Sequence, residues 1–136
     1  MEFFEKISAD KAKLLSPTVL AFVGDAVMTL YVREHLAKSS DAKAGKLHVL
    51  TAKTVCSKAQ AELLDGIFGV LSEEEREIFR RSRNTKTHSV SKNGTLADYK
   101  KASGLEAVLG YHYLTGNFAR CKEILDFTLK KKISEN

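Results

Sequence analysis

The sequence has no tryptophan, one proline and only two cysteines among its 136 residues. So little proline argues against a disordered, proline-rich chain. The two cysteines, Cys56 and Cys121, lie far apart in amphipathic segments, which favours reduced, packed thiols over a disulfide or a zinc site. The four histidines form no cluster with the spacing of metal ligands.

Long apolar runs and an export signal are also missing. No uncharged run reaches the ~18 residues that a membrane-spanning helix needs. The N-terminal residues carry acids where a signal peptide carries bases, and no cleavable apolar region follows. We therefore expect a cytoplasmic protein that does not act at a membrane.

The composition is typical of a soluble globular domain, with 43% hydrophobic and 29% charged residues. No segment alternates between apolar and polar residues for long enough to predict a strand. The sequence thus predicts a single all-α domain that spans residues 1–136. The net charge of +5 is a modest excess of base, and its meaning depends on where the bases lie.

The apolar periodicity predicts a series of helices with recognisable ends. They are expected over residues 17–36, 42–56, 57–68, 73–82, 96–114 and 118–131, after a short helix or turn within residues 2–14. The expected N-caps are Ser16, Asp41, Ser72, Thr95 and Asn117, and the expected helix-ending glycines are Gly69 and Gly116.

The helix at 17–36 is almost entirely apolar and carries one carboxylate, Asp25, at its centre. Its apolar stripe is so wide that we expect the rest of the protein to cover most of it and to desolvate Asp25 in part. One interpretation is a structural, salt-bridged aspartate. Gly24 favours another, because a glycine inside a helix is costly and suggests a close approach of other backbone beside the acid.

A second single acid, Glu106, lies in the helix at 96–114 among small residues. Ala102, Ser103 and Gly110 share its face, so another helix could approach closely there, and the helix with Gly24 is the natural candidate. The two carboxylates would then converge and repel each other unless a hard cation such as Mg²⁺ lay between them. The alternative is two unrelated acids, each with a local hydrogen bond.

Residues 80–94 are rich in bases and loop-forming residues, which predicts a long surface loop. It is either a solvated charged loop or a site that holds a polyanion. Lys100 and Lys101 could extend such a basic patch.

Two segments resemble the ribonuclease III family in the order that this family has them. Residues 22–32, FVGDAVMTLYV, resemble the signature helix of its catalytic domain, and residues 104–114, GLEAVLGYHYL, resemble its second acidic helix. Residues 46–61 between them extend the resemblance, which covers about 16–128. The segments RSRNTK at 81–86 and SKNG at 91–94 look more narrowly like the short bacterial Mini-III branch.

The resemblance implies a homodimeric endonuclease that cuts double-stranded RNA with Mg²⁺, or with Mn²⁺ in its place, and needs no small-molecule cofactor. For this branch it implies cytoplasmic maturation of precursor large-subunit (23S) ribosomal RNA. Asp25 and Glu106 match the two acids that the branch keeps, as catalytic residues and metal ligands. Other family members have further acids where this chain has Thr18, Ala21 and Ser103, so metal binding without RNA is expected to be weak.

The resemblance also suggests how RNA is held. The chain ends soon after the last expected helix, so we expect no appended RNA-binding domain, and the basic segment must contact the duplex. A-form RNA is recognised by shape, through phosphates and 2′-hydroxyls. His88 and His112 are not needed as bases if a metal ion activates the water. The residues expected to bind RNA are Arg81, Arg83, Asn84, Lys86, His88, Lys92 and Asn93.

Two rival functions remain open from the sequence. One is a non-catalytic RNA-binding or ribosome-associated protein with the same fold, which the presence of both acids opposes. The other is a helical DNA-binding module, which would need a short basic recognition helix that is not evident.

Overall fold

The structure is a computed structural model that describes residues 4–55, 66–84 and 96–134. Within these ranges the regular structure consists of helices without any strand, so the predicted all-α fold class is confirmed. None of the described helices combines the length and the apolar character needed to cross a membrane. The helices are α1 Ala9–Leu14, α2 Pro17–Ser39, α3 Ala44–Val55, α5 Ile67–Val70, α6 Glu73–Arg83, α7 Leu96–Leu114 and α8 Phe118–Ser134.

Helix ends follow the cap residues where a hydroxyl or amide side chain was available. The Ser16 hydroxyl accepts a hydrogen bond from the Val19 amide at 3.2 Å, and Pro17 occupies the first turn of α2. Ser72 and Glu75 form a reciprocal capping box at the start of α6. Asn117 accepts a hydrogen bond from the Arg120 amide at the start of α8, at 3.4 Å.

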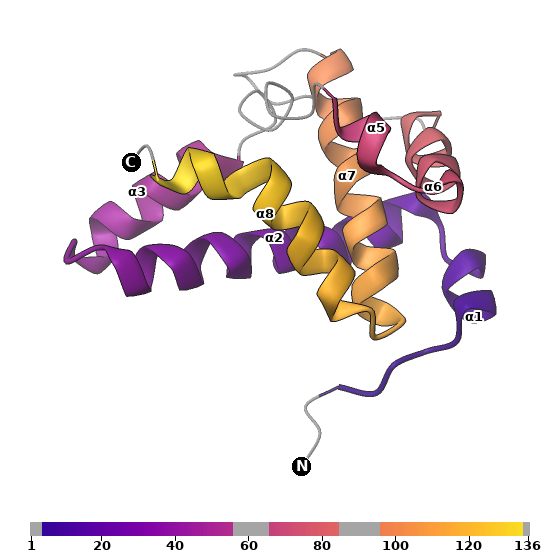
Figure 1. Cartoon of the computed structure of the whole chain (residues 1–136), viewed down its shortest axis with the longest axis horizontal. Coiled ribbons are helices and arrows are strands. Elements are labelled where there is room, and N and C mark those ends of the chain that lie inside the picture. The colour runs from indigo at the N-terminus through magenta and orange to yellow at the C-terminus, as the bar shows by residue number, and fades with distance from the viewer. Residues whose placement is uncertain (1–3, 56–65, 85–95, 135–136) are drawn as a thin grey trace.

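The core lies where α7 crosses α2, with α8 against both helices (Figure 1). Leu20, Met28 and Val32 of α2 are fully buried there. Leu105, Val108 and Leu109 of α7 are fully buried as well. Each such side chain contributes about 1.5–3 kcal/mol through removal of apolar surface from water. Helices α1, α3, α6 and α8 each pack against α2, α7 or both.

The second predicted helix differs from the structure at its start and in its buried face. Helix α3 begins at Ala44, so Asp41 lies before it and is not its N-cap. Thr51 and Thr54 are buried and Ala52 is exposed, the reverse of what their polarity alone would predict. Both threonine hydroxyls donate back to the carbonyl four residues earlier, at 2.8 Å, which satisfies them without water.

The predicted end at Gly69 is wrong, because Gly69 lies inside the short helix α5. The residue just before α5 is Gly66, whose left-handed φ of 89° favours glycine. The predicted helix at 57–68 and Cys56 fall mainly outside the described residues. Cys121 is a free, buried thiol, as expected.

The expectation that the chain itself would cover most of α2 is wrong. Phe22 is 79% exposed, Leu30 61% and Val19 45%, and all three lie along one side of the helix. The opposite side of α2 supplies the buried core residues. An apolar strip along the central helix therefore faces outward in the single chain.

Candidate active site

Two glycines let α2 and α7 touch backbone to backbone. A Cβ placed on Gly24 would overlap the carbonyl group of Glu106, and a Cβ on Gly110 would overlap the carbonyl group of Leu20. Any side chain at either position would push the helices apart. The close approach that the glycines predicted is thus present, and it brings the turn that bears Glu106 against the turn that bears Asp25.

The carboxylates of Asp25 and Glu106 interact electrostatically across this contact. Burial first, and then the negative charge of Asp25, together raise the pKa of Glu106 to about 8. Glu106 is partly buried, but Asp25 is exposed, which corrects the expectation that Asp25 would be desolvated. The site is therefore a pair of unlike acids, with one at the surface and one set behind it.

This pair fits a hard divalent cation in its chemistry. Among the described residues, neither carboxylate has a hydrogen-bond or ion-pair partner, so their oxygens are available to a metal. The same residues contain no cluster of three or more acids, histidines or cysteines that could hold an ion by themselves. A cation here would have to take its other ligands from water or from a phosphate.

The predicted RNA-binding residues fall partly within the described chain. Arg81 and Arg83 lie in the last turn of α6, and Asn84 is its C-cap. This part of the segment is therefore helical, whereas a loop was predicted. Lys100 and Lys101 are partly buried on α7. The remaining four, Lys86, His88, Lys92 and Asn93, lie outside the described residues.

A buried ion network that the sequence did not predict ties α6 to α7 and α8. Glu75 is only 2% exposed and accepts two hydrogen bonds from Arg120, from Nε at 2.8 Å and from Nη2 at 2.7 Å. His112 Nε2 lies 2.5 Å from the second Glu75 oxygen, and because an ionised carboxylate only accepts, this nitrogen carries the proton. The expected N-cap at Ser72 placed Glu75 in the first turn of a helix, but nothing in the sequence pointed to Arg120, 45 residues away.

The network holds Glu75 in its ionised form. Burial by itself would raise the pKa of Glu75, but hydrogen bonds from Arg120, the Ser72 amide and His112 outweigh it and lower the pKa to about 2. Arg120 Nη2 also donates to the Val70 carbonyl at 2.7 Å. His112 is thus part of the scaffold, away from the acid pair.

Comparison with known proteins places this geometry in a family. Residues 18–117 match the ribonuclease III domain. The chain is 42% identical over 130 residues to Mini-ribonuclease 3 of Thermoanaerobacter sp. (strain X514), an alignment that covers 96% of this chain and 92% of that protein. It is 39% identical to Mini-ribonuclease 3 of Streptococcus pneumoniae, over 87% of this chain and 94% of the relative.

A solved structure has a similar fold. The crystal structure of a protein from Fusobacterium nucleatum superposes with a TM-score of 0.78 at 29% identity, over 88% of this chain and 96% of that one. The chain therefore belongs to the ribonuclease III family and is an endoribonuclease. The family match confirms the resemblance read from the two acidic helices, and the Mini-ribonuclease 3 relatives confirm the narrower resemblance read from residues 81–86 and 91–94.

Proposed function

We propose that the protein is a Mg²⁺-dependent homodimeric endonuclease for double-stranded RNA, with Asp25 and Glu106 as its catalytic metal ligands. The observation that carries this proposal is the convergence of two carboxylates at a glycine-lined helix crossing, where neither has another partner within the described part of the chain. Hard oxygen donors are what Mg²⁺ prefers, and a phosphodiester supplies the further oxygens that the site lacks.

The protein residues in this proposal bind and orient rather than transfer protons. Exposed Asp25 would meet the cation together with the RNA phosphate, while partly buried Glu106 would fix the cation against α7. A bound Mg²⁺ would supply an activated water and stabilise the charge that develops on the phosphate. Because both acids lie on the backbones that touch, their separation is set by the fold and not by flexible side chains.

Family membership supports the remaining parts of the proposal. We infer that Arg81, Arg83 and Asn84, at the end of α6, contact the phosphates of a duplex. The outward apolar strip of Val19, Phe22 and Leu30 fits a self-complementary C2 interface between two copies. As substrate we propose precursor 23S ribosomal RNA in the cytoplasm, in keeping with relatives that are named Mini-ribonuclease 3.

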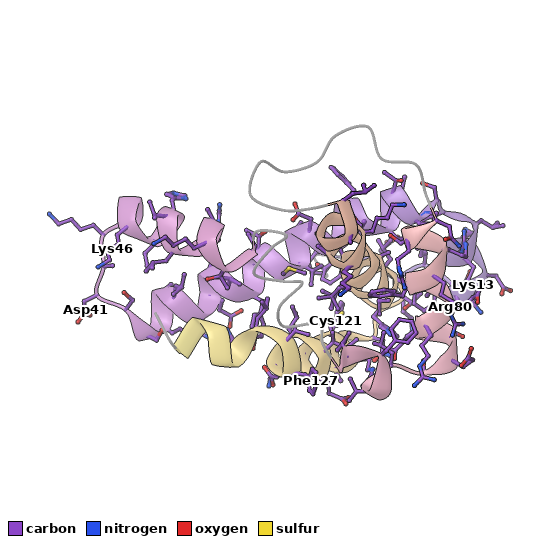
Figure 2. All side chains as sticks on the ribbon, turned by 90° about the horizontal axis from the view of Figure 1, so that it is seen from above. Lys13, Asp41, Lys46, Arg80, Cys121 and Phe127 are labelled. Carbon is purple, nitrogen blue, oxygen red and sulfur yellow. The ribbon has the colours of Figure 1, made fainter. Side chains whose placement is uncertain are left out.

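The test is cleavage of duplex RNA by Asp25→Asn and Glu106→Gln in Mg²⁺ or Mn²⁺. Each change keeps the shape but removes a metal-binding charge, so we expect cleavage to fall at least about 100-fold while duplex binding in EDTA stays intact. Asp41→Asn, an exposed acid at the tip of the α2–α3 hairpin (Figure 2), is the matched control and should cut normally. Cleavage by either site variant at the wild-type rate would refute the assignment.

A further inference from the structure

The aromatic rings of Phe68 and Phe79 pack against each other beside the turn of α7 that bears Glu106. The ring of Phe79 on α6 lies against Gly104, where an added Cβ would be 2.8 Å from two ring carbons. Phe68 packs edge-on against Phe79, with ring centroids 5.1 Å apart and planes at 88°. Arg76 and Arg80 place their guanidinium groups 5.8 and 5.7 Å from the Phe68 centroid.

The other side of the same turn is fixed by α2. Gly104 and Glu106 are two residues apart on α7, and the Glu106 carbonyl lies directly against Gly24. One turn of α7 is therefore held between the backbone of α2 and the ring of Phe79. Removal of either support leaves room for this turn, and its carboxylate, to shift.

Helix α6 is itself anchored, so Phe79 cannot easily yield. Glu75 lies one helical turn before Phe79 and on the same side of α6, because residues four apart share a face. It is bound to His112 on α7 and to Arg120 on α8. With Glu75 at one contact and Phe79 at the other, α6 meets α7 at two separated points, which fixes its position along α7.

We propose that Phe79 is a positioning residue for the acid pair, whose ring presses the Glu106 turn onto α2 and so sets the distance from Glu106 to Asp25. The proposal rests on the metal-dependent function proposed above. No contact of the Phe79 ring with RNA or metal is needed for this role. Its effect on the reaction would pass through the α7 backbone.

The experiment measures Mn²⁺ binding to the metal-free protein without RNA, at protein concentrations high enough to follow a weak site, from the loss of the free-ion electron paramagnetic resonance signal. Phe79→Leu removes the ring but keeps the site apolar, and we expect it to weaken Mn²⁺ binding about tenfold. The Mn²⁺ concentration for half-maximal single-turnover cleavage should rise by the same factor. Affinity for duplex RNA in EDTA should stay unchanged.

A second variant approaches the contact from the other side. Gly104→Ala adds a methyl group against the intact Phe79 ring and should also weaken Mn²⁺ binding, because the turn must move to make room. In the Phe79→Leu/Gly104→Ala double variant the methyl group fills the space that the ring left. We expect Mn²⁺ affinity there to return to within about threefold of wild type, a strong positive coupling.

Leu36→Ala is the matched control, since it loses the same number of side-chain carbon atoms at a buried position far along α2. It should lower the melting temperature but leave Mn²⁺ affinity unchanged. Wild-type Mn²⁺ affinity in Phe79→Leu, an equal loss in Leu36→Ala, or single-variant losses that simply multiply in the double variant would overturn the positioning role. A wild-type protein that neither binds Mn²⁺ nor cleaves duplex RNA would refute the proposed function itself.

Discussion

Two glutamates in this molecule, Glu106 and Glu75, have pKa values that are shifted in opposite directions. Glu106 is partly buried and lies near the negative charge of Asp25, and its pKa is raised to about 8. Glu75 is almost wholly buried among donors, and its pKa is lowered to about 2. A partly buried carboxylate beside another acid destabilises the fold and is typical of a functional site. A buried carboxylate that accepts from cationic donors links α6, α7 and α8 and is typical of a structural role.

The Glu75 network should make the fold sensitive to acid. Its lowered pKa means that its contribution is complete above the ordinary value of 4.5 and is lost as the pH falls toward 2. Glu75→Gln removes the buried carboxylate that Arg120 and His112 share. Arg120 then keeps its ion pair with Glu123 at 3.3 Å and its bond to Val70, and the free energy of unfolding should fall by about 3 kcal/mol at pH 7. The difference from wild type should shrink between pH 4.5 and pH 2, as followed by urea unfolding.

Glu77→Gln provides the control for this prediction. Its side chain is 64% exposed and pairs only loosely with Arg80, at 3.7 Å, so the free energy of unfolding should change by less than about 0.5 kcal/mol. A Glu75→Gln variant as stable as Glu77→Gln would show that the buried bonds add nothing.

At the scale of helices, the sequence predicted best what local chemistry determines. The starts of α2 and α6 follow from Ser16 and Ser72, because a cap acts within one turn. The convergence of the acids was also predictable, because a glycine inside a helix is costly and Gly24 and Gly110 therefore suggest a close approach of two backbones. The exposure of Asp25 and the partnership of Glu75 with Arg120 were not, because each depends on which side of a helix meets a neighbour distant in sequence.

The α2–α7 contact gives a prediction that reverses ordinary helix propensity. Alanine is favoured over glycine by about 1 kcal/mol within a helix, yet Gly110→Ala should destabilise the protein by about 3 kcal/mol, because its methyl group would overlap the Leu20 carbonyl. Gly45→Ala on α3 meets nothing within 4 Å and should stabilise by about 0.5 kcal/mol. Urea unfolding of both variants tests the pair, and a Gly110→Ala variant as stable as wild type would contradict this crossing.

The whole molecule is elongated, with charged side chains at both of its ends (Figure 2). The α2–α3 hairpin, with Asp41 and Lys46 at its tip, lies at one end, and Lys13 and Arg80 lie toward the other (Figure 2). The apolar strip of α2 runs between them on the outside. Such a strip on an isolated chain favours association over solvation.

Phe22→Glu tests the proposed dimer. It places a charge at the centre of the apolar strip, so light scattering at micromolar concentration should report the 15.1 kDa monomer, while wild type should show twice that mass. Phe127→Glu is the control, because Phe127 on α8 is also exposed, at 52%, but lies outside the strip. A monomeric wild type, or dimers in both variants, would exclude this interface.

The contact at Gly24 also limits how such an enzyme could be made more heat-resistant. On the proposed function, the residues that hold the core helices together also position the acid pair, so repacking this crossing would alter turnover along with the melting temperature. Substitutions at open glycines such as Gly45 or Gly69 avoid that conflict, since a side chain there has free space. An engineer would therefore begin at the periphery and leave the α2–α7 crossing untouched.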